Sequence, residues 1–421
     1  MPDSPQPAPR IAVIGGGAAG FFAAITAAES NPAVRVELFE KSTRFLGKVK
    51  ISGGGRCNVT HACFDPSALA EHYPRGGREL RGAFHRWQPR DTIDWFEGRG
   101  VALKTEEDGR VFPVSDDSRT IIDCLIDSAR EAGVVLRPGV GISSLKRHAP
   151  DFELTLTGGE TRYADRVFLA PGSLRGSPLV ASLESLGHTI ESLAPSLFAL
   201  DVRDERIRNL PGLSVENARA ALAPKGKPHF GPLLVTHKGL SGPAILRLSA
   251  WEARRMRELG YRAELAVSWL CDTKPETLKT ELASLRRSHG KRTVRNTPAG
   301  GLPARLWDNL VAAAGIAPDT PWGRLPRSGE NALTTQLLDS RFAVIGKTMN
   351  KEEFVTCGGV RLREVDFRTM ESRLVPGLHF GGECLDLDGV TGGFNFQAAW
   401  TTGFLAGRAM SAAATGDWSG S

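Results

Sequence analysis

A strand, a glycine turn, a helix and a second strand follow one another near the start of the chain, and this order constrains the fold more than any other feature. An apolar run over 11–14 precedes the turn, an alanine-rich stretch over 21–29 follows it, and apolar residues alternate over 34–39. The turn itself, Gly15–Gly20, fits G-x-G-x-x-G. Such a turn between a strand and a helix binds the pyrophosphate of a dinucleotide at the helix N-terminus. The sequence therefore predicts a Rossmann-like unit in an α/β protein.

Each part of this unit has its own role in dinucleotide binding. Gly15 allows the tight turn, Gly17 lets the backbone approach the pyrophosphate, and Gly20 lets the helix pack closely on the strand. Glu40 follows Gly20 by twenty residues, which is the spacing of an acid that accepts hydrogen bonds from ribose hydroxyls. Because a carboxylate repels a 2′-phosphate, the predicted ligand is FAD or NAD rather than NADP.

The overall composition limits the class of protein. A chain of 421 residues is too long for one ordinary core, so we expect two or three domains. No run approaches the roughly 18 apolar residues that cross a bilayer, so no membrane partner is expected. The six cysteines are scattered without paired spacing, which indicates reduced thiols and a cytoplasmic protein. Cys57, His61 and Cys63 lack a second cluster that would complete a tetrahedral set, so no metal site is predicted.

Basic residues are concentrated in two segments, although the formal net charge is only +6. Residues 286–295 hold five Lys or Arg and no acid, and residues 75–90 hold five Arg and one Glu. Phe84 and Trp87 are interleaved with the arginines of the second segment. Such clusters favour binding to a polyanion. The alternative interpretation is a solvated basic surface.

A second strand–turn–helix pattern lies near the C-terminus. A strand ends at 381–383 in Gly-Gly-Glu, a glycine turn follows over 389–393, and a helix is predicted over 394–410. In flavoproteins whose FAD lies along the first βαβ unit, a late Gly–acid pair holds the ribitol, and the next helix points its N-terminus at the pyrimidine edge of the flavin. The positive end of that helix stabilises negative charge on the reduced ring. Alone, this pattern would fit a plain strand–turn–helix unit; with the N-terminal turn, it favours FAD over NAD.

Residues 48–60 form a third element with chemical potential. Gly53–Gly55 give a loop that can lie flat against a ring system. Arg56 is a cation for a phosphate or a reduced flavin, and Cys57 is a candidate general acid or redox thiol. The alternative for Cys57 is a small buried filler, which is the common role of a free cysteine.

The remaining sequence predicts ordinary elements around these motifs. An amphipathic helix is expected over 116–131, with Ser115 or Asp116 as its cap. A buried strand over 166–170 leads into a turn at Pro171–Gly172, where backbone can approach a ligand. The further predictions are a leader without structure over 1–9, a hairpin over 143–156, β-strands over 198–202, 218–223, 231–236 and 263–269, helices over 276–285 and 303–314, and a loose tail from Ala414.

Four strings match one family in the same order along the chain. They are IAVIGGGAAG (11–20), GKVKISGGGRCNVT (47–60), GPLLVTHKGLSGPAILRLS (231–249) and the segment 355–410. On these strings the chain resembles the bacterial HI0933-like flavoproteins, also called BaiN-type or aminoacetone-oxidase-family NAD(P)/FAD-dependent oxidoreductases. The chain departs from the family pattern at 170–174, where Ala-Pro-Gly-Ser-Leu stands in place of the usual Gly-Gly and an aromatic–Pro pair.

The resemblance implies a fold of three parts. A Rossmann-like FAD-binding domain is built from both chain ends, 10–200 and 357–413. A β-barrel-like domain, 201–275 and 340–356, and a small helical domain, 276–339, are inserted between them.

The resemblance and the local motifs together give a set of FAD-binding residues. The set is Gly15, Gly17, Ala18, Ala19, Gly20, Glu40, Lys41, Lys48, Ser52, Gly53, Gly54, Arg56, Asn58, Ala170, Gly172, Gly382, Glu383, Gly393, Phe394, Asn395 and Phe396. Because the sequence lacks a second G-x-G-x-x-G unit, NAD(P)H is expected only as a transient reductant.

The family resemblance also implies chemistry on an activated carbon–carbon double bond. Its members are linked to a uridine of large-subunit ribosomal RNA or to a bile-acid intermediate. The first hypothesis is therefore an NAD(P)H-dependent reductase that forms dihydrouridine, with Cys57 or His237 as the acid. The alternatives are a small-molecule flavin reductase or oxidase acting on an enone or amine, and a non-catalytic flavin-binding partner of RNA or protein. His237 and Ser241 fit a loop capping the flavin pocket better than a hydrolase pair.

Overall fold

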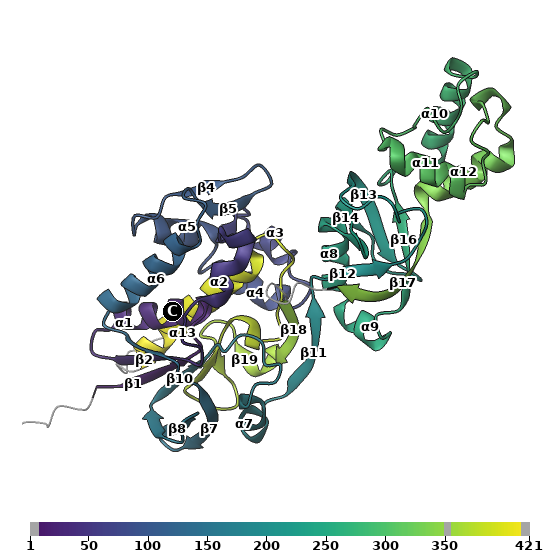
Figure 1. Cartoon of the computed structure of the whole chain (residues 1–421). Coiled ribbons are helices and arrows are strands. Elements are labelled where there is room, and N and C mark those ends of the chain that lie inside the picture. Colours follow the sequence, from purple (N-terminus) through teal and green to yellow (C-terminus); the bar gives the residue numbers. More distant parts are fainter. Residues whose placement is uncertain (1–7, 349–354, 414–421) are drawn as a thin grey trace, which may run out of the picture. The chain divides into compact units, whose positions relative to one another are not determined.

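The computed structural model describes residues 8–348 and 355–413 (Figure 1). The chain divides into two compact units, one formed by 1–194 with 355–421 and the other by 195–354. The tail predicted from Ala414, and the predicted leader up to residue 7, lie outside the described residues.

The helices and strands of the first unit come from both ends of the chain. Its α-helices are α1 (Ala18–Ser30), α2 (Gly47–Ile51), α3 (Pro66–Ala70), α4 (Gly77–Phe84), α5 (Pro89–Glu97), α6 (Arg119–Glu131), α7 (Leu179–Ser185) and α13 (Phe394–Ala413). Its strands are β1 (Arg10–Ile14), β2 (Arg35–Glu40), β3 (Thr60–His61), β4 (Leu103–Thr105), β5 (Arg110–Pro113), β6 (Val135–Pro138), β7 (Ile142–His148), β8 (Asp151–Leu156), β9 (Thr161–Ala164), β10 (Arg166–Leu169), β18 (Val355–Val360), β19 (Val365–Asp366), β20 (Glu371–Ser372) and β21 (Leu378–Phe380). Strand β11 (Ile190–Ser196) pairs with β18, and short 3₁₀ segments are η1 (Ser52–Gly55), η3 (Leu362–Glu364) and η4 (Gly382–Cys384).

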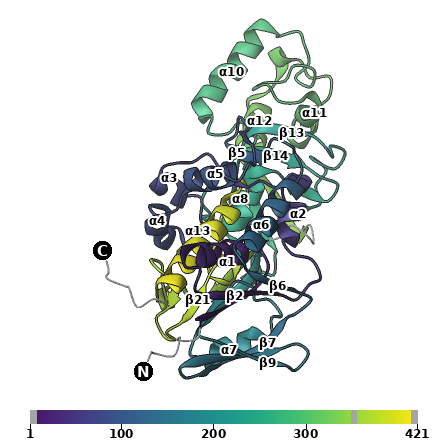
Figure 2. The same ribbon diagram turned by 90° about the vertical axis from the view of Figure 1, so that its left-hand side faces the viewer.

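The central sheet of the first unit has the strand order β19-β20-β21-β10-β1-β2-β6. The pairs from β21 to β6 are parallel, whereas β19, β20 and β21 pair antiparallel at one edge. Helices α1 and α13 lie over one face, and the antiparallel sheet β7-β8-β9 lies below the other (Figures 1 and 2). Because both faces are covered, β1 and β10 read as short apolar runs rather than alternating ones.

Helices α1 and α13 pack so closely that only glycine fits at two contact points. A Cβ on Gly403 would lie 2.5 Å from the carbonyl oxygen of Ala19, and a Cβ on Gly407 would lie 2.6 Å from that of Ala23. Residues 18–28 of α1 are all buried, which is the pattern of a helix inside a protein rather than on its surface. This contact joins the first fifth of the chain to its C-terminal helix.

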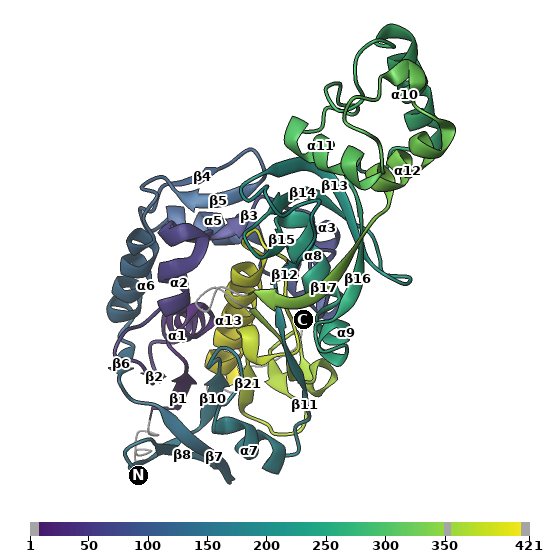
Figure 3. The same ribbon diagram turned by 45° about the vertical axis from the view of Figure 1, so that its right-hand side comes forward.

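The second unit contains a closed barrel with the strand order β12-β15-β14-β13-β16-β17, whose strands are drawn in teal and green in Figure 3. The barrel strands are β12 (Ala199–Val202), β13 (Ser214–Leu222), β14 (His229–Val235), β15 (Gly239–Ser241), β16 (Ala263–Ser268) and β17 (Ser340–Thr348). The helices are α8 (Pro243–Trp251), α9 (Ala253–Glu258), α10 (Pro275–Ser288), α11 (Ala304–Ala313), α12 (Arg327–Leu338) and the 3₁₀ segment η2 (Trp322–Arg324). One hydrophobic cluster runs from the barrel, with Leu265 and Phe342, into the helices, with Trp307 and Leu333.

The structure corrects one helix boundary and adds elements that the sequence patterns missed. The predicted helix over 116–131 begins only at Arg119, because Asp116 has a left-handed φ of +52° and the Asp117 carboxylate accepts a hydrogen bond from the Arg119 N–H (2.9 Å). Neither proposed cap, Ser115 nor Asp116, is the first residue before the helix, which is Ser118. Helices α8 and α12 are among the elements that the sequence patterns do not predict.

None of the helices in the described ranges combines the length and the apolar character needed to span a membrane.

We expect Gly407→Ala to lower the free energy of unfolding by about 1–3 kcal/mol, because the added methyl group overlaps the α1 backbone. Thermal unfolding followed by circular dichroism would measure the loss. The matched control is Gly82→Ala in α4, where an added Cβ meets no described atom within 4 Å. That exchange should be neutral or stabilising, because alanine has a higher helix propensity than glycine. Equal melting temperatures for wild type and Gly407→Ala would contradict the tight helix contact.

Candidate cofactor-binding site

The first glycine turn is shaped by close backbone approaches at two of its glycines. Gly15 has a φ of +111°, and a Cβ there would lie 2.1 Å from the carbonyl oxygen of Ala170 at the end of β10. A Cβ on Gly20 would lie 1.9 Å from the carbonyl oxygen of Gly15. These two glycines are therefore required by the packing of β1, α1 and β10, as the fingerprint predicts.

Gly17 differs from Gly15 and Gly20 because no backbone atom lies close to its Cα on the side where a Cβ would point. It precedes α1 with an extended backbone, and a Cβ there would meet no described atom within 4 Å. No side chain caps the N-terminus of α1 among the described residues, and the first N–H groups of a helix have no partner within it. Ala18, Ala19 and Gly20 thus supply the N–H groups of the first turn, which is the arrangement that binds a phosphate.

The Glu40 carboxylate is fixed at the end of β2 beside this turn. Its Oε2 accepts a hydrogen bond from the Gly16 N–H (2.8 Å), and its Oε1 accepts from the N–H and the hydroxyl of Ser42 (2.8 Å each). A carboxylate can accept about four hydrogen bonds, so capacity for a ribose hydroxyl remains. Lys41, the next residue, is exposed.

Residues from the two chain ends meet beside the first glycine turn. Lys48 forms an ion pair with Glu383, whose other oxygen accepts from the Thr356 N–H (3.0 Å). Gly382 has a φ of +65°, and a Cβ there would lie 3.3 Å from the Cβ of Ala19. A Cβ on Gly172 would lie 3.8 Å from the Glu383 carboxylate. The structure therefore brings together predicted site residues that are more than 300 positions apart.

The 53–58 loop is built on left-handed backbone and is tied to the start of α13. Gly53, Gly54 and Gly55 have φ values of +58°, +69° and +87°. The Ser52 carbonyl accepts from the Cys57 N–H (3.0 Å), which closes the loop. With its amide oriented to satisfy its partners, Asn58 accepts from the Gly393 N–H at 3.0 Å.

The start of α13 is held by side chains of its own turn and of the segment between α3 and α4. Asn395 bonds the backbone of Gly389 in both directions, accepting from its N–H and donating to its carbonyl at 2.9 Å each. The Tyr73 hydroxyl donates to the Phe394 carbonyl (2.6 Å). The Phe394 ring stacks with His72 at 4.1 Å between ring centroids, and Phe396 stacks with Trp400 at 5.7 Å. Tyr73 and His72 belong to no motif in the sequence, and neither was predicted at this site.

The candidate cofactor site, or cradle, consists of Gly15–Gly20, Glu40, the 52–58 loop and residues 382–396. The cradle offers a phosphate-binding helix start, a carboxylate for ribose, a flat glycine loop and a second helix start. These residues fit an extended dinucleotide with a ring system, as in FAD. Ala170 and Gly172 line the same region through the contacts of Gly15 and Glu383.

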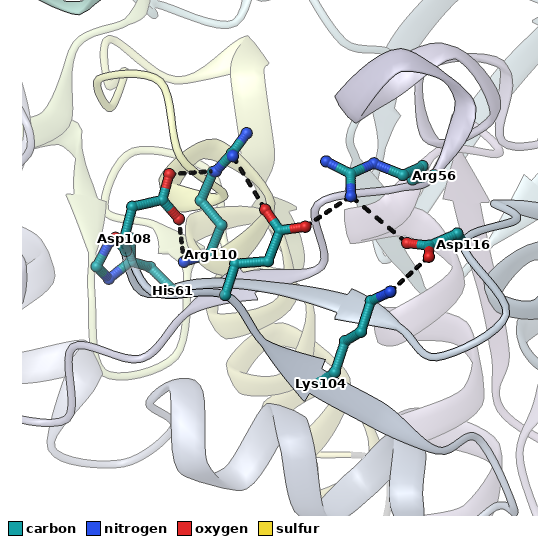
Figure 4. A network of polar contacts seen from close by, with 7 residues as sticks. Arg56, His61, Lys104, Asp108, Arg110 and Asp116 are labelled. Atoms are coloured by element: carbon teal, nitrogen blue, oxygen red, sulfur yellow. Dashed lines mark hydrogen bonds and ion pairs between the residues drawn. The ribbon is translucent and has the colours of Figure 1, made fainter. Parts of the chain in front are cut away.

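Arg56 lies in a network of charged side chains rather than alone (Figure 4). Its guanidinium donates to Glu106 (2.6 Å), lies 3.5 Å from Asp116, and stacks over the Phe112 ring at 3.9 Å. The hydrogen bond with Glu106 raises the pKa of Arg56 above its ordinary value. Lys104 pairs with Asp116 in the same network. A phosphate or a reduced flavin would therefore have to compete with two carboxylates for this cation.

The chain matches the family model described as HI0933-like protein Rossmann domain over residues 9–409. The chain belongs to the HI0933-like family. It is 31% identical over 411 residues to the ribosomal RNA dihydrouridine synthase of Escherichia coli (strain K12), covering 95% of this chain and 98% of that protein. It is 30% identical over 414 residues to the 3-dehydro-bile acid delta(4,6)-reductase of Clostridium scindens, with the same coverage of 95% and 98%.

A solved structure shows the same fold at low sequence identity. The 3-ketosteroid delta1-dehydrogenase of Sterolibacterium denitrificans matches with a TM-score of 0.51 and 13% identity, covering 96% of this chain and 99% of that chain. The HI0933-like chain thus has a Rossmann-type FAD-binding fold with a barrel and helices, and its family is one of FAD-dependent oxidoreductases. The predicted fold class and the predicted family are confirmed.

The two predicted catalytic residues lie in different units. Cys57 is fully buried, and burial raises the pKa of its thiol to about 12, an effect that a hydrogen bond with Ser52 reduces. His237 is exposed in the turn between β14 and β15 of the second unit, and Ser241 ends β15. Their catalytic roles stay predictions.

Metal-binding side chains are not grouped in the part of the chain that the structure describes. No three His, Cys, Asp or Glu side chains come together there in a way that could hold an ion. His188 and His379 are buried, whereas His85 is exposed.

We expect Gly17→Val to fold normally and to weaken FAD binding at least tenfold. The extended backbone of Gly17 accepts any residue, while the new side chain would fill the space beside the α1 N-terminus. Titration of the apoprotein with FAD, followed by flavin fluorescence, would measure the affinity. The matched control is Gly158→Val in the turn between β8 and β9, where space is equally open. Unchanged FAD affinity in the Gly17 variant would place the pyrophosphate elsewhere.

Proposed function

We propose that this HI0933-like protein is an FAD-dependent reductase that adds two hydrogens across an activated carbon–carbon double bond, with a uridine of large-subunit ribosomal RNA as its substrate. The observation that carries the proposal is the cradle, in which Lys48 and Glu383 join the two chain ends beside the phosphate-binding turn. The names of both curated relatives denote reduction of a double bond conjugated to a carbonyl group, which supports the reaction class.

The cradle residues divide the work of holding the cofactor. The α1 N-terminus would bind the pyrophosphate and Glu40 the ribose, while Glu383 and the 53–58 loop would hold the ribitol and the ring. When bound, FAD supplies hydride transfer, and NAD(P)H is proposed as its reductant. The N-terminus of α13 would stabilise negative charge that develops at the ring's pyrimidine edge.

Hydride addition to a conjugated bond leaves a negative charge that must be quenched by a proton. Cys57 is the candidate donor within the cradle. Because burial raises the pKa of its thiol to about 12, the group keeps its proton throughout the neutral range. It lies at the end of the glycine loop, where its backbone has a left-handed φ of +62°. His237 remains the alternative donor, from the second unit.

Ribosomal RNA is favoured as substrate by charge. The basic segment 75–90 suits a polyanion better than a small molecule. Segment 286–295 supports this less, because two of its arginines pair with acids outside it. The second candidate substrate is an enone of the bile-acid class, supported by the nearly equal similarity to the Clostridium scindens protein. A purely structural flavin-binding role has no comparable support.

Deletion of the gene tests the substrate directly. Large-subunit RNA from the deletion strain should lack one dihydrouridine that the parent strain contains, as measured by mass spectrometry of nuclease digests. Re-expression of the wild-type gene should restore it, and re-expression of Gly17→Val should not. Identical digests from parent and deletion strains would exclude this substrate and leave the enone as the candidate.

We expect Cys57→Ala to slow substrate reduction by about 10²- to 10⁴-fold, the usual contribution of a general acid, while leaving flavin reduction by NAD(P)H unchanged. Stopped-flow measurement of the two half-reactions separates these effects. The matched control is Cys124→Ala on α6, another shielded cysteine outside the cradle, which should alter neither half-reaction. Full substrate turnover by Cys57→Ala would assign the proton to another group, with His237→Gln as the next variant.

A further inference from the structure

A groove with many arginines lies in the first unit, between helix α4 and the segment from η3 to β20. Its volume is about 690 Å³. The two walls come from positions about 280 residues apart, so the groove exists only in the folded protein. Its arginines are Arg78, Arg81, Arg86, Arg363, Arg368 and Arg373, together with His85, and all of these side chains are exposed.

The acids of the groove pair with only some of these arginines. Asp366 is paired with Arg368 (2.7 Å) and lies 3.7 Å from Arg373, and the hydrogen bond with Arg368 lowers the pKa of Asp366 below its ordinary value. Glu79 is the other acid of the lining. Arg78, Arg81 and Arg363 form no ion pair with any residue in 8–348 or 355–413. These three exposed cations are therefore available to an anionic ligand.

An aromatic side chain lies among the cations. Phe367 lines the groove and is partly exposed, next in sequence to Arg368. Cations that follow a backbone, combined with an aromatic ring on which a base can stack, are the usual elements of a single-stranded nucleic acid site. An acidic protein would need the cations but not the ring.

In the second basic segment, 286–295, fewer cations are available to an anionic ligand. Arg286 pairs with Glu330 (2.9 Å), and Arg295 pairs with Asp308. These partners lie outside the segment, so the sequence alone overstates its charge. Arg287, Lys291 and Arg292 remain exposed there and provide a matched comparison.

The groove is linked to the cradle through one buried ion pair. Arg75, two residues before α4, pairs with Asp388, which is fully buried and directly precedes the glycine turn of α13. The helix that carries Arg78 and Arg81 is thus anchored to the segment that leads into the predicted flavin site.

We propose that this groove binds the phosphate backbone of the substrate RNA, with Arg78, Arg81 and Arg363 contacting phosphates and Phe367 stacking on an unpaired base. The inference rests on the proposed function for its choice of RNA. The docking surface would then lie in the first unit, with residues 362–373 forming one of its walls.

The test compares two triple variants that each remove three positive charges. One carries Arg78→Gln, Arg81→Gln and Arg363→Gln; the other carries Arg287→Gln, Lys291→Gln and Arg292→Gln. The probe is large-subunit RNA purified from the deletion strain, and its affinity is measured by filter binding at several salt concentrations. The groove variant should bind at least tenfold more weakly, and its slope of log affinity against log salt should fall by about two to three. The comparison variant should lose less than threefold.

Phe367→Ala distinguishes RNA from other polyanions. It should weaken binding of the RNA about fivefold or more, because a stacked base is lost, and leave heparin binding unchanged. FAD content and flavin reduction by NAD(P)H should equal those of the wild type in every variant, which shows that the fold is intact.

The RNA-binding role of the groove and the proposed reaction can fail independently in these experiments. Wild-type RNA affinity in the groove variant, or an equal loss in the comparison variant, would overturn the groove assignment even if dihydrouridine is formed normally. Equal effects of Phe367→Ala on RNA and heparin, or tight binding of poly-glutamate, would indicate a general anion or protein surface and overturn the RNA assignment. Weakened RNA binding in a protein whose deletion removes no dihydrouridine would retain the groove and reject the proposed reaction.

Discussion

The close contact between α1 and α13 is the interaction on which the rest of the first unit depends. Gly403 and Gly407 allow the two helices to approach backbone to backbone. That approach places the N-terminus of α13 and the Gly382–Glu383 pair beside the first glycine turn. The ion pair between Lys48 and Glu383 then has its geometry set by helix packing. Since an exposed ion pair of this kind is worth little alone, the packing stabilises the cradle and the ion pair positions it.

The segment before α13 also connects the cradle to the arginine groove. The glycine turn before α13 is closed by Asn395, held by Tyr73 and preceded by Asp388, which pairs with Arg75. One short segment therefore supports a predicted ring-binding surface on one side and the helix of a basic groove on the other. Under the proposed function, this shared segment would connect the RNA-binding groove to the cofactor-binding surface.

Local features of the site could be predicted from the sequence, whereas its long-range contacts could not. The roles of Gly15 and Gly20 follow from backbone rules, and the structure gives both glycines the close approaches that these rules require.

The pairing of Arg56 with Glu106, or of Arg75 with Asp388, depends on chain segments that meet only after folding. The helical spacing of its neighbours predicts Asp116 as the first residue or the cap of a helix. Its left-handed backbone and its ion pairs with Arg56 and Lys104 place it outside. The arginines of 363–373 escaped notice because acids separate them in the sequence.

The buried pair of Arg75 and Asp388 has a consequence for how genetic data on this protein should be interpreted. By sequence Arg75 is one of a row of arginines, but its side chain is mostly shielded and its partner is fully buried. Truncating it would remove the ion-pair partner of a buried carboxylate, at a cost of about 3–5 kcal/mol. A strain with that substitution would lose activity through low abundance of folded enzyme. Such a phenotype would resemble a defect in nucleic-acid contact while arising from a protein that no longer folds.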